Sequence, residues 1–223
     1  AHMGFVLIGF AAFTSIGISG AVLQMISHGL IAAVMFFLSG VAYERAHTLD
    51  MTKLGGMARK MPVAFAFFTA AAMASLALPG MSGFVSEIAV FLGMATSDAY
   101  TLPFKISIIV LAAIGVILSP VYLLTMLRRI FYGDTGEVIE KTPLILDIRP
   151  REVFIAACLL VPVIGIGLYP NVATQTYDAK TMAVLNRVQD TMMLVADRPA
   201  QPMFSAIASP ERMASLTAPT IIE

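Results

Sequence analysis

The sequence is poor in charged residues and in cysteine. Only 13% of its 223 residues are Asp, Glu, Lys or Arg, whereas soluble domains average about 25%. Too few polar side chains are present to cover a water-soluble fold, and 58% of the residues are hydrophobic, with a mean hydropathy of +0.86. The composition therefore indicates a membrane protein. The formal net charge is zero, so nothing in it favours nucleic acid as a partner.

Several kinds of reaction centre are also missing from the sequence. Cys158 is the only cysteine, so an internal disulfide is excluded, and we expect this residue to be a small apolar packing residue. The sequence shows no metal-ligand spacing, no Gly-rich phosphate loop and no nucleophile–base pair. We therefore expect no metal, no cofactor and no redox chemistry in this chain itself.

Long apolar runs occupy most of the chain. A membrane span needs about 20 apolar residues, which predicts an all-α, polytopic transmembrane helix bundle over residues 1–173. The expected spans are about 1–14 (partial), 21–43, 61–97, 104–127 and 153–169, with a small-residue loop over 14–20. Helical spacing of apolar residues predicts an amphipathic surface helix over 174–197, followed by an irregular C-terminal tail over 198–223.

One run, residues 61–97, has the wrong length for a simple span. As a straight helix it is about 55 Å long at about 1.5 Å per residue, against a hydrocarbon core of about 30 Å. It is also too short for two spans. The turn residues Pro79, Gly80 and Gly83 therefore predict a helix broken at 79–83. Irregular backbone at membrane depth is tolerated only inside protein or beside a wet cavity, so the break marks a candidate site.

Glu87 is the only ionisable residue within 61–97. The predicted break places it about one turn into a new half-helix, whose positive end favours the anion. Loss of water favours the neutral acid instead. These opposed effects make Glu87 a candidate to take and release a proton. The alternative is a static ion pair with a Lys or Arg of a neighbouring helix, which would serve assembly alone.

Histidines supply the other candidates. His28 lies inside the span 21–43, with Gln24 four residues earlier on the same face. An imidazole can pass a proton between its two nitrogens, although a plain interhelical hydrogen bond would also explain His28. His2 is either native or part of a cloning remnant. Lys105 lies near the end of a span, where we expect its side chain to extend to the interface.

The charged loops indicate an orientation. The loops at 44–60 and 128–152 fall on one side and hold nine Lys and Arg residues, whereas the loops at 14–20 and 96–103 hold none. The positive-inside rule places the charged loops on the cytoplasmic side and the C-terminal tail opposite.

Several motifs match a known family. They are HMGF at 2–5, QMISHGL at 24–30, YERAHT at 43–48 and LALPGMSGFVSE at 76–87. Together they resemble the antiporter-like membrane subunits of complex I, and within these the M-type branch. SPVYLLTMLRRIFYG at 119–133 and RPREVF at 149–154 are most similar to the version in oxygenic phototrophs. The resemblance runs from residue 2 to about residue 173.

The resemblance implies a fold and the place of this sequence within it. The family fold has fourteen transmembrane helices in two inverted repeats, each with one broken helix. This sequence resembles the second half, as a C-terminal fragment in which His2 is native. In the sister L-type branch and in related cation/proton antiporters the position of Glu87 is usually Lys, so the acid here favours the M-type branch.

The resemblance also implies a function. It is proton translocation along Glu87, His28 and His2 in a quinone oxidoreductase of thylakoid membranes, where the quinone is plastoquinone. Other membrane subunits and lipid are the expected partners, and iron–sulfur clusters and quinone belong to other subunits. The alternatives are a subunit of a stand-alone sodium/proton antiporter and a non-translocating membrane scaffold.

Overall fold

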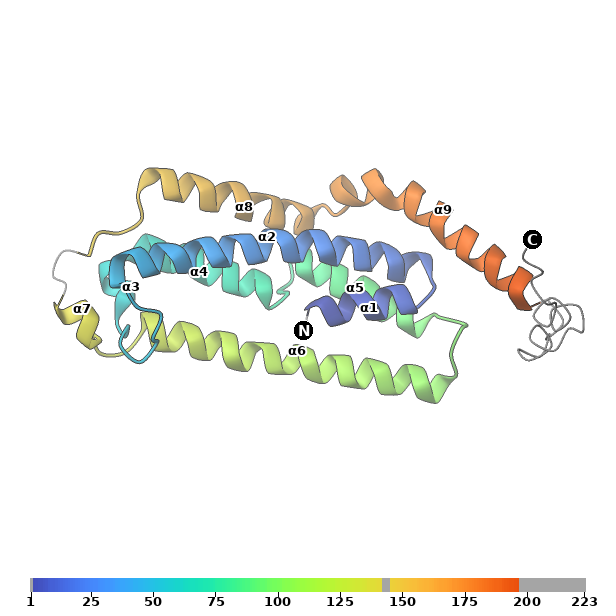
Figure 1. Ribbon diagram of the computed structural model, residues 1–223, viewed down its shortest axis with the longest axis horizontal. Coiled ribbons are helices and arrows are strands. Elements are labelled where there is room, and N and C mark those ends of the chain that lie inside the picture. Colours follow the sequence, from blue (N-terminus) through green and yellow to red (C-terminus); the bar gives the residue numbers. More distant parts are fainter. Residues whose placement is uncertain (1, 142–144, 197–223) are drawn as a thin grey trace, which may run out of the picture. The chain divides into compact units, whose positions relative to one another are not determined.

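The structure is a computed structural model that describes residues 2–141 and 145–196 (Figure 1). The described residues form helices and no strand, so the predicted all-α class is confirmed. The helices are α1 (His2–Ala11), α2 (Ser15–Ala46), α3 (Met57–Lys60), α4 (Pro62–Ser75), α5 (Ser82–Ala95), α6 (Leu102–Phe131), α7 (Glu137–Lys141), α8 (Pro150–Leu168) and α9 (Asn171–Ala196).

The chain divides into two compact units. The first extends to Met182 and contains α1 to α8 with the first part of α9, and the second begins at Ala183. In the second unit the structure describes only the remainder of α9. The predicted tail at 198–223 lies outside the described residues.

Three helices of the described chain, α2, α6 and α8, are long and apolar enough to cross a membrane. The apolar helices α1, α4 and α5 are shorter. Helices α4 and α5 lie within the single stretch 61–97, which is therefore broken. The predicted loop at 14–20 is wrong, because α2 already begins at Ser15. Thr14 caps it by accepting a hydrogen bond from the Gly17 amide at 3.2 Å.

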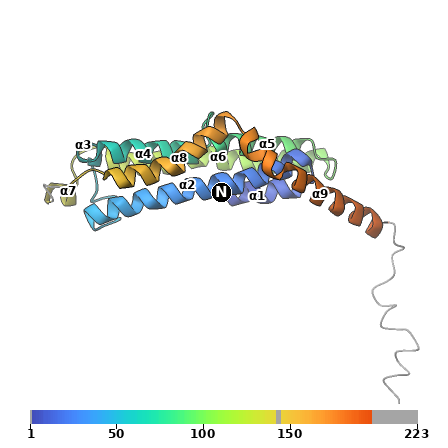
Figure 2. The ribbon, with the colours of Figure 1, turned by 90° about the horizontal axis from the view of Figure 1, so that it is seen from above.

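The small residues of the stretch 14–20 serve helix packing. A Cβ added at Gly20 would meet the backbone of Val90 in α5 at 2.9 Å, and one added at Gly93 would overlap the backbone of Gly17. The glycines therefore let α2 and α5 approach closely. The prediction failed because composition alone cannot distinguish glycines that form a loop from glycines that serve close helix packing. Helix α2 also packs against α1, α4 and α8 (Figure 1, Figure 2).

The connecting loops gather at two ends of the first unit. The loops at 44–60 and 128–152 meet, since the Gly56 amide donates to the Tyr132 carbonyl at 3.2 Å and the Gly136 amide to the Gly55 carbonyl at 2.9 Å. We call this the charged end. At the opposite end the turn between α1 and α2 lies near the connection between α5 and α6 (Figure 1), and Tyr100 Oη donates to the Ala11 carbonyl at 2.9 Å. Which end faces the cytoplasm stays a prediction.

Helix α9 begins against the end opposite to the charged end. Tyr177 Oη donates to the Ser19 carbonyl at 3.2 Å, and Ser19 Oγ donates to Asp178 Oδ1 at 2.8 Å. Burial raises the pKa of Tyr177 above its usual range. These contacts attach the first part of α9 to the start of α2.

Candidate functional site

The first half of the broken helix, α4, ends in a Schellman motif. The Ala77 amide donates to the Ala74 carbonyl at 3.1 Å, and the Leu78 amide reaches back to the Met73 carbonyl at 3.4 Å. Ala77 occupies the left-handed position of this motif, with φ 52°. Glycine is the usual residue there, so the end of α4 stores local backbone strain.

A β-turn follows at once. The Met81 amide donates to the Leu78 carbonyl at 3.0 Å, and Gly80, with φ 94°, takes the third place behind Pro79. This order is that of a type II turn. Helix α5 then starts at Ser82, so the break covers residues 76–81.

The predicted break at 79–83 extends too far towards α5. Gly83 is the second residue of α5, and a Cβ there would meet the Ala74 carbonyl at 3.2 Å. It lets the two half-helices approach and takes no part in the turn itself. Helix-breaking residues alone could not locate this boundary, because Ala77 and the apolar Leu76 and Leu78 form half of the break.

His2 lies against the open end of α4. Its Nε2 is 3.0 Å from the carbonyl oxygen of Ser75, the last residue of α4. A carbonyl only accepts, so Nε2 carries the hydrogen in this contact. The last carbonyls of a helix have no partner within it, and His2 supplies one. The rings of His2 and His28 are in contact, with centroids 5.3 Å apart and planes at 52°. The structure thus brings both histidines to the end of α4.

A buried hydrogen bond lies between α2 and α5 near this point. Gln24 is 2% exposed and Ser86 is fully buried. The Ser86 hydroxyl donates to the Gln24 side-chain oxygen. The two helices run antiparallel here, because Gly20 also faces Val90, farther along α5.

Glu87 is the residue after Ser86, and it is 7% exposed. Among residues 2–141 and 145–196, no group forms a hydrogen bond or ion pair with its carboxyl. The static ion pair considered as an alternative is therefore not formed within the described chain, and neither histidine is hydrogen-bonded to Glu87 there.

Lys105 contacts the end of α5. Its Nζ donates to the carbonyls of Ala95 at 3.1 Å and Ser97 at 2.9 Å, at the end of α5. A cation there complements the negative end of the helix. Lys105 thus caps the half-helix that carries Glu87, and whether its side chain extends to the membrane interface stays a prediction.

Two buried serines belong to the same region, and the sequence analysis missed them. The hydroxyls of Ser27 and Ser82 are fully buried and have no hydrogen-bond partner within the part of the chain that the structure describes. With Gln24 bonded to Ser86, the antiparallel register places Ser27 of α2 opposite Ser82 of α5. Unpaired buried hydroxyls are costly. The only clue in the sequence was the presence of serine within the apolar stretches that form α2 and α5.

No group of three or more His, Cys, Asp or Glu side chains within the described ranges is arranged to hold a metal ion. What the region offers is a carboxyl, two imidazoles in contact and several hydroxyls in an apolar interior. These groups can accept, donate and pass protons.

Comparison with known proteins gives the family context. The family described as NADH:quinone oxidoreductase/Mrp antiporter, transmembrane, matches residues 1–115. Curated relatives named NAD(P)H-quinone oxidoreductase chain 4 are 55% identical over 99% of this chain in a Nostoc strain, 60% over 91% in a Synechococcus strain and 54% over 99% in Acaryochloris marina. The chain spans about 40% of the length of these relatives.

Two solved structures share the fold. A chain of respiratory complex I from Thermus thermophilus with bound NADH is 25% identical with a TM-score of 0.71, covering 83% of this chain and 37% of that chain. A chain of the Mrp complex from Dietzia is 20% identical with a TM-score of 0.68, covering 81% of this chain and 40% of that chain.

Proposed function

Because this chain belongs to the NADH:quinone oxidoreductase/Mrp antiporter transmembrane family, we propose that it is part of a proton-translocating membrane subunit of a quinone oxidoreductase. Its relatives at 54–60% identity are named NAD(P)H-quinone oxidoreductase chain 4, which supports this choice over a stand-alone sodium/proton antiporter. The observation that carries the proposal is Glu87, a buried carboxyl beside a helix break, with no bonded partner in the described chain.

In this proposal Glu87 takes up and releases the proton. Two forces act on its carboxyl in opposite directions. The apolar surroundings favour the neutral acid, whereas the positive start of α5, five residues earlier, favours the anion only weakly because this effect falls off within the first turn. No counterion in the described residues fixes either state. A modest change in the local field would then suffice to load or unload Glu87.

The two histidines pass the proton along. His2 holds its Nε2 hydrogen against the Ser75 carbonyl, which leaves Nδ1 as the nitrogen that exchanges a proton. The contact between the rings of His2 and His28 allows transfer between them directly or through one water. The chain provides no direct bond from either ring to Glu87 within the described residues, so water completes the path.

The remaining parts of the reaction belong to other subunits. We propose that iron–sulfur clusters and plastoquinone there carry the electrons, and that a structural or electrostatic change reaches this chain through neighbouring membrane subunits. A thylakoid membrane is the proposed location, with the charged end on the cytoplasmic or stromal side and the C-terminal tail in the lumen.

The experiment is Glu87→Gln in the full-length protein within its complex. We expect assembly and electron transfer to persist and coupled proton translocation to fall at least tenfold. Glu140→Gln, at an exposed position of α7, is the matched control and should leave translocation unchanged. Full translocation in the assembled Glu87→Gln complex would exclude the proposed path and favour a scaffold. Sodium-dependent transport without electron transfer would favour the antiporter.

A further inference from the structure

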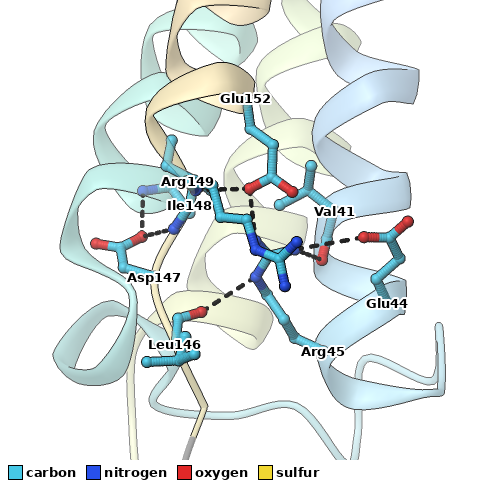
Figure 3. A network of polar contacts seen from close by, with 9 residues as sticks. Val41, Glu44, Arg45, Leu146, Asp147, Ile148, Arg149 and Glu152 are labelled. Atoms are coloured by element: carbon cyan, nitrogen blue, oxygen red, sulfur yellow. Dashed lines mark hydrogen bonds and ion pairs between the residues drawn. The ribbon is translucent and has the colours of Figure 1, made fainter.

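The segment before α8 binds the helix that ends at His2. Asp147 accepts hydrogen bonds from the amides of Val63 at 2.8 Å and Ala64 at 3.1 Å, in the first turn of α4. Its Oδ1 also accepts from the Ile148 amide at 2.7 Å (Figure 3). One carboxylate therefore joins the start of α4 to the start of α8.

Helix α4 needs such a partner. Its N-cap residue, Met61, makes no side-chain cap hydrogen bond, and its first residue is Pro62, which has no amide hydrogen. The next two amides would stay unpaired without Asp147. A carboxylate here also complements the positive end of the helix. The residue that caps α4, Asp147, therefore lies more than eighty positions after it in the sequence.

The same segment fixes the end of α2. Arg45, in the last turn of α2, forms an ion pair with Glu152 at 2.5 Å and donates from Nε to the Leu146 carbonyl at 3.1 Å. Glu152 Oε2 also accepts from the Arg149 amide at 2.7 Å (Figure 3). Both charged side chains are about nine-tenths buried, so this contact is tightly defined.

Both fixed helices run from the charged end to the histidines. From Arg45 to His28 along α2 is roughly 26 Å, and from Val63 to Ser75 along α4 is roughly 18 Å, at about 1.5 Å per residue. Between these points the two helices share a close-packed core that includes Val34, Leu38, Phe68 and Ala71. Close-packed interiors transmit a shift instead of absorbing it. The axial position of α4 against α2 therefore sets where the Ser75 carbonyl lies relative to His28.

We propose that Asp147 is a positioning residue for the two histidines, acting through α4 on the contact between His2 and the Ser75 carbonyl. Asp147 touches neither histidine. It holds the far end of the half-helix whose last carbonyl binds His2, while Arg45 and Glu152 hold the helix that carries His28. This inference rests on the proposed function, since it assigns Asp147 to the same proton path.

The test compares Asp147→Ala and Asp147→Asn with Asp50→Asn in the full-length protein within its complex. Asp50 is the matched control, because it also accepts an amide hydrogen bond at the charged end, from Thr52 at 3.0 Å, but only inside its own loop. Three quantities are measured: hydrogen exchange of the Val63 and Ala64 amides, the ¹⁵N chemical shift of His2 Nε2 and the translocation rate.

In Asp147→Ala we expect exchange of the two amides to rise about tenfold, as for loss of a helix cap. The His2 signal should move towards that of an imidazole without the carbonyl contact, and translocation should fall about tenfold. Asp147→Asn keeps one acceptor oxygen and should give smaller changes of the same kind. Asp50→Asn should change none of the three.

The His2 signal separates this inference from the proposed function. If Asp147→Asn assembles and raises amide exchange while the His2 signal stays at its wild-type position, Asp147 caps α4 without positioning His2, and the inference is wrong. If the His2 signal moves in Asp147→Asn but Glu87→Gln translocates fully, the positioning role stands and the proposed path fails.

Discussion

The charged end pairs its buried charged side chains, whereas the region of the helix break leaves some of its buried polar groups unpaired in the described chain. At the charged end, Arg45, Asp147 and Glu152 are each bonded to an opposite charge or to backbone groups. Near the break His2 and Ser86 are hydrogen-bonded, but the hydroxyls of Ser27 and Ser82 have no partner among the described residues, and no group there bonds the Glu87 carboxyl. Paired charges resist a change of protonation. The difference suggests that the charged end holds the helices while the break keeps groups free to change state.

Removal of one partner at the charged end should have the largest effect on stability. In Glu152→Ala the Arg45 side chain, 11% exposed, loses its buried counterion and keeps only the exposed Glu44. Removing one partner of a buried ion pair costs about 3–5 kcal/mol. We expect a loss of this size in the free energy of unfolding, measured by detergent titration. Glu44, at 3.8 Å from Arg45 and 74% exposed, is the control: Glu44→Ala should change stability by less than about 1 kcal/mol. Equal losses of stability in Glu152→Ala and Glu44→Ala would show that burial does not determine the strength of the ion pair between Arg45 and Glu152.

Disrupting the close backbone packing of α2 against α5 should cause the next largest loss of stability, because this packing holds the region of the break together without ion pairs in the described chain. An added methyl group in Gly93→Ala would overlap the backbone of Gly17. Overpacking of this kind costs about 1–3 kcal/mol. Gly115→Ala in α6, where an added Cβ meets nothing within 4 Å, should be neutral or stabilising, since alanine favours a helix. Thermal unfolding of both variants checks this, and an unchanged melting temperature in Gly93→Ala would contradict the close contact of α2 and α5.

Relieving the backbone strain at Ala77 in the break should increase the stability of the protein. Ala77→Gly removes the side chain from a left-handed position, φ 52°, and should stabilise the protein by about 1 kcal/mol. Ala74→Gly, inside α4, is the control and should destabilise it by about the same amount. Unfolding measurements on the pair decide the matter. If both variants destabilise, Ala77 is not at the C-terminal cap of α4.

The smallest effect should lie in the exposed loop of the charged end. Hydrogen bonds from the Thr52 hydroxyl and amide hold the pKa of Asp50 below its usual range. A lowered pKa stabilises the fold above the ordinary pKa of the group, and that contribution disappears as the pH falls through the lowered value. Thr52→Val should therefore raise the Asp50 pKa, measured by carboxyl ¹³C NMR. An unchanged titration would show that the Thr52 hydroxyl contributes nothing.

The sequence predicted the fold class and the broken helix because both follow from apolar run length. It failed where small residues have two uses: the glycines at 17 and 20 suggested a loop, and they pack α2 against α5. The boundary of the break depended on a Schellman motif that uses Ala77, and alanine carries no turn signal. Asp147 and Glu152 were seen only as loop residues, since their partners lie 83 to 107 positions away and local patterns contain no such information.

The candidate site was predicted in part. Glu87 stood out as a lone acid in an apolar stretch, and the contact of His2 with His28 joins two residues named from motifs. The two serines were missed because serine is common in membrane helices, and only the packed structure shows that their hydroxyls have no partner among the described residues. The role of all these groups in proton transfer stays a prediction.

Infrared difference spectroscopy of Glu87 tests the central claim most directly. Spectra of the full-length protein in its complex, recorded at rest and during turnover, should contain a carboxylic acid C=O band that changes in amplitude and is absent in Glu87→Gln. That result would show a proton arriving at and leaving this carboxyl. A Glu87 that gives only the bands of an ionised carboxylate, unchanged in both states, would contradict the account and leave Glu87 as a static charge.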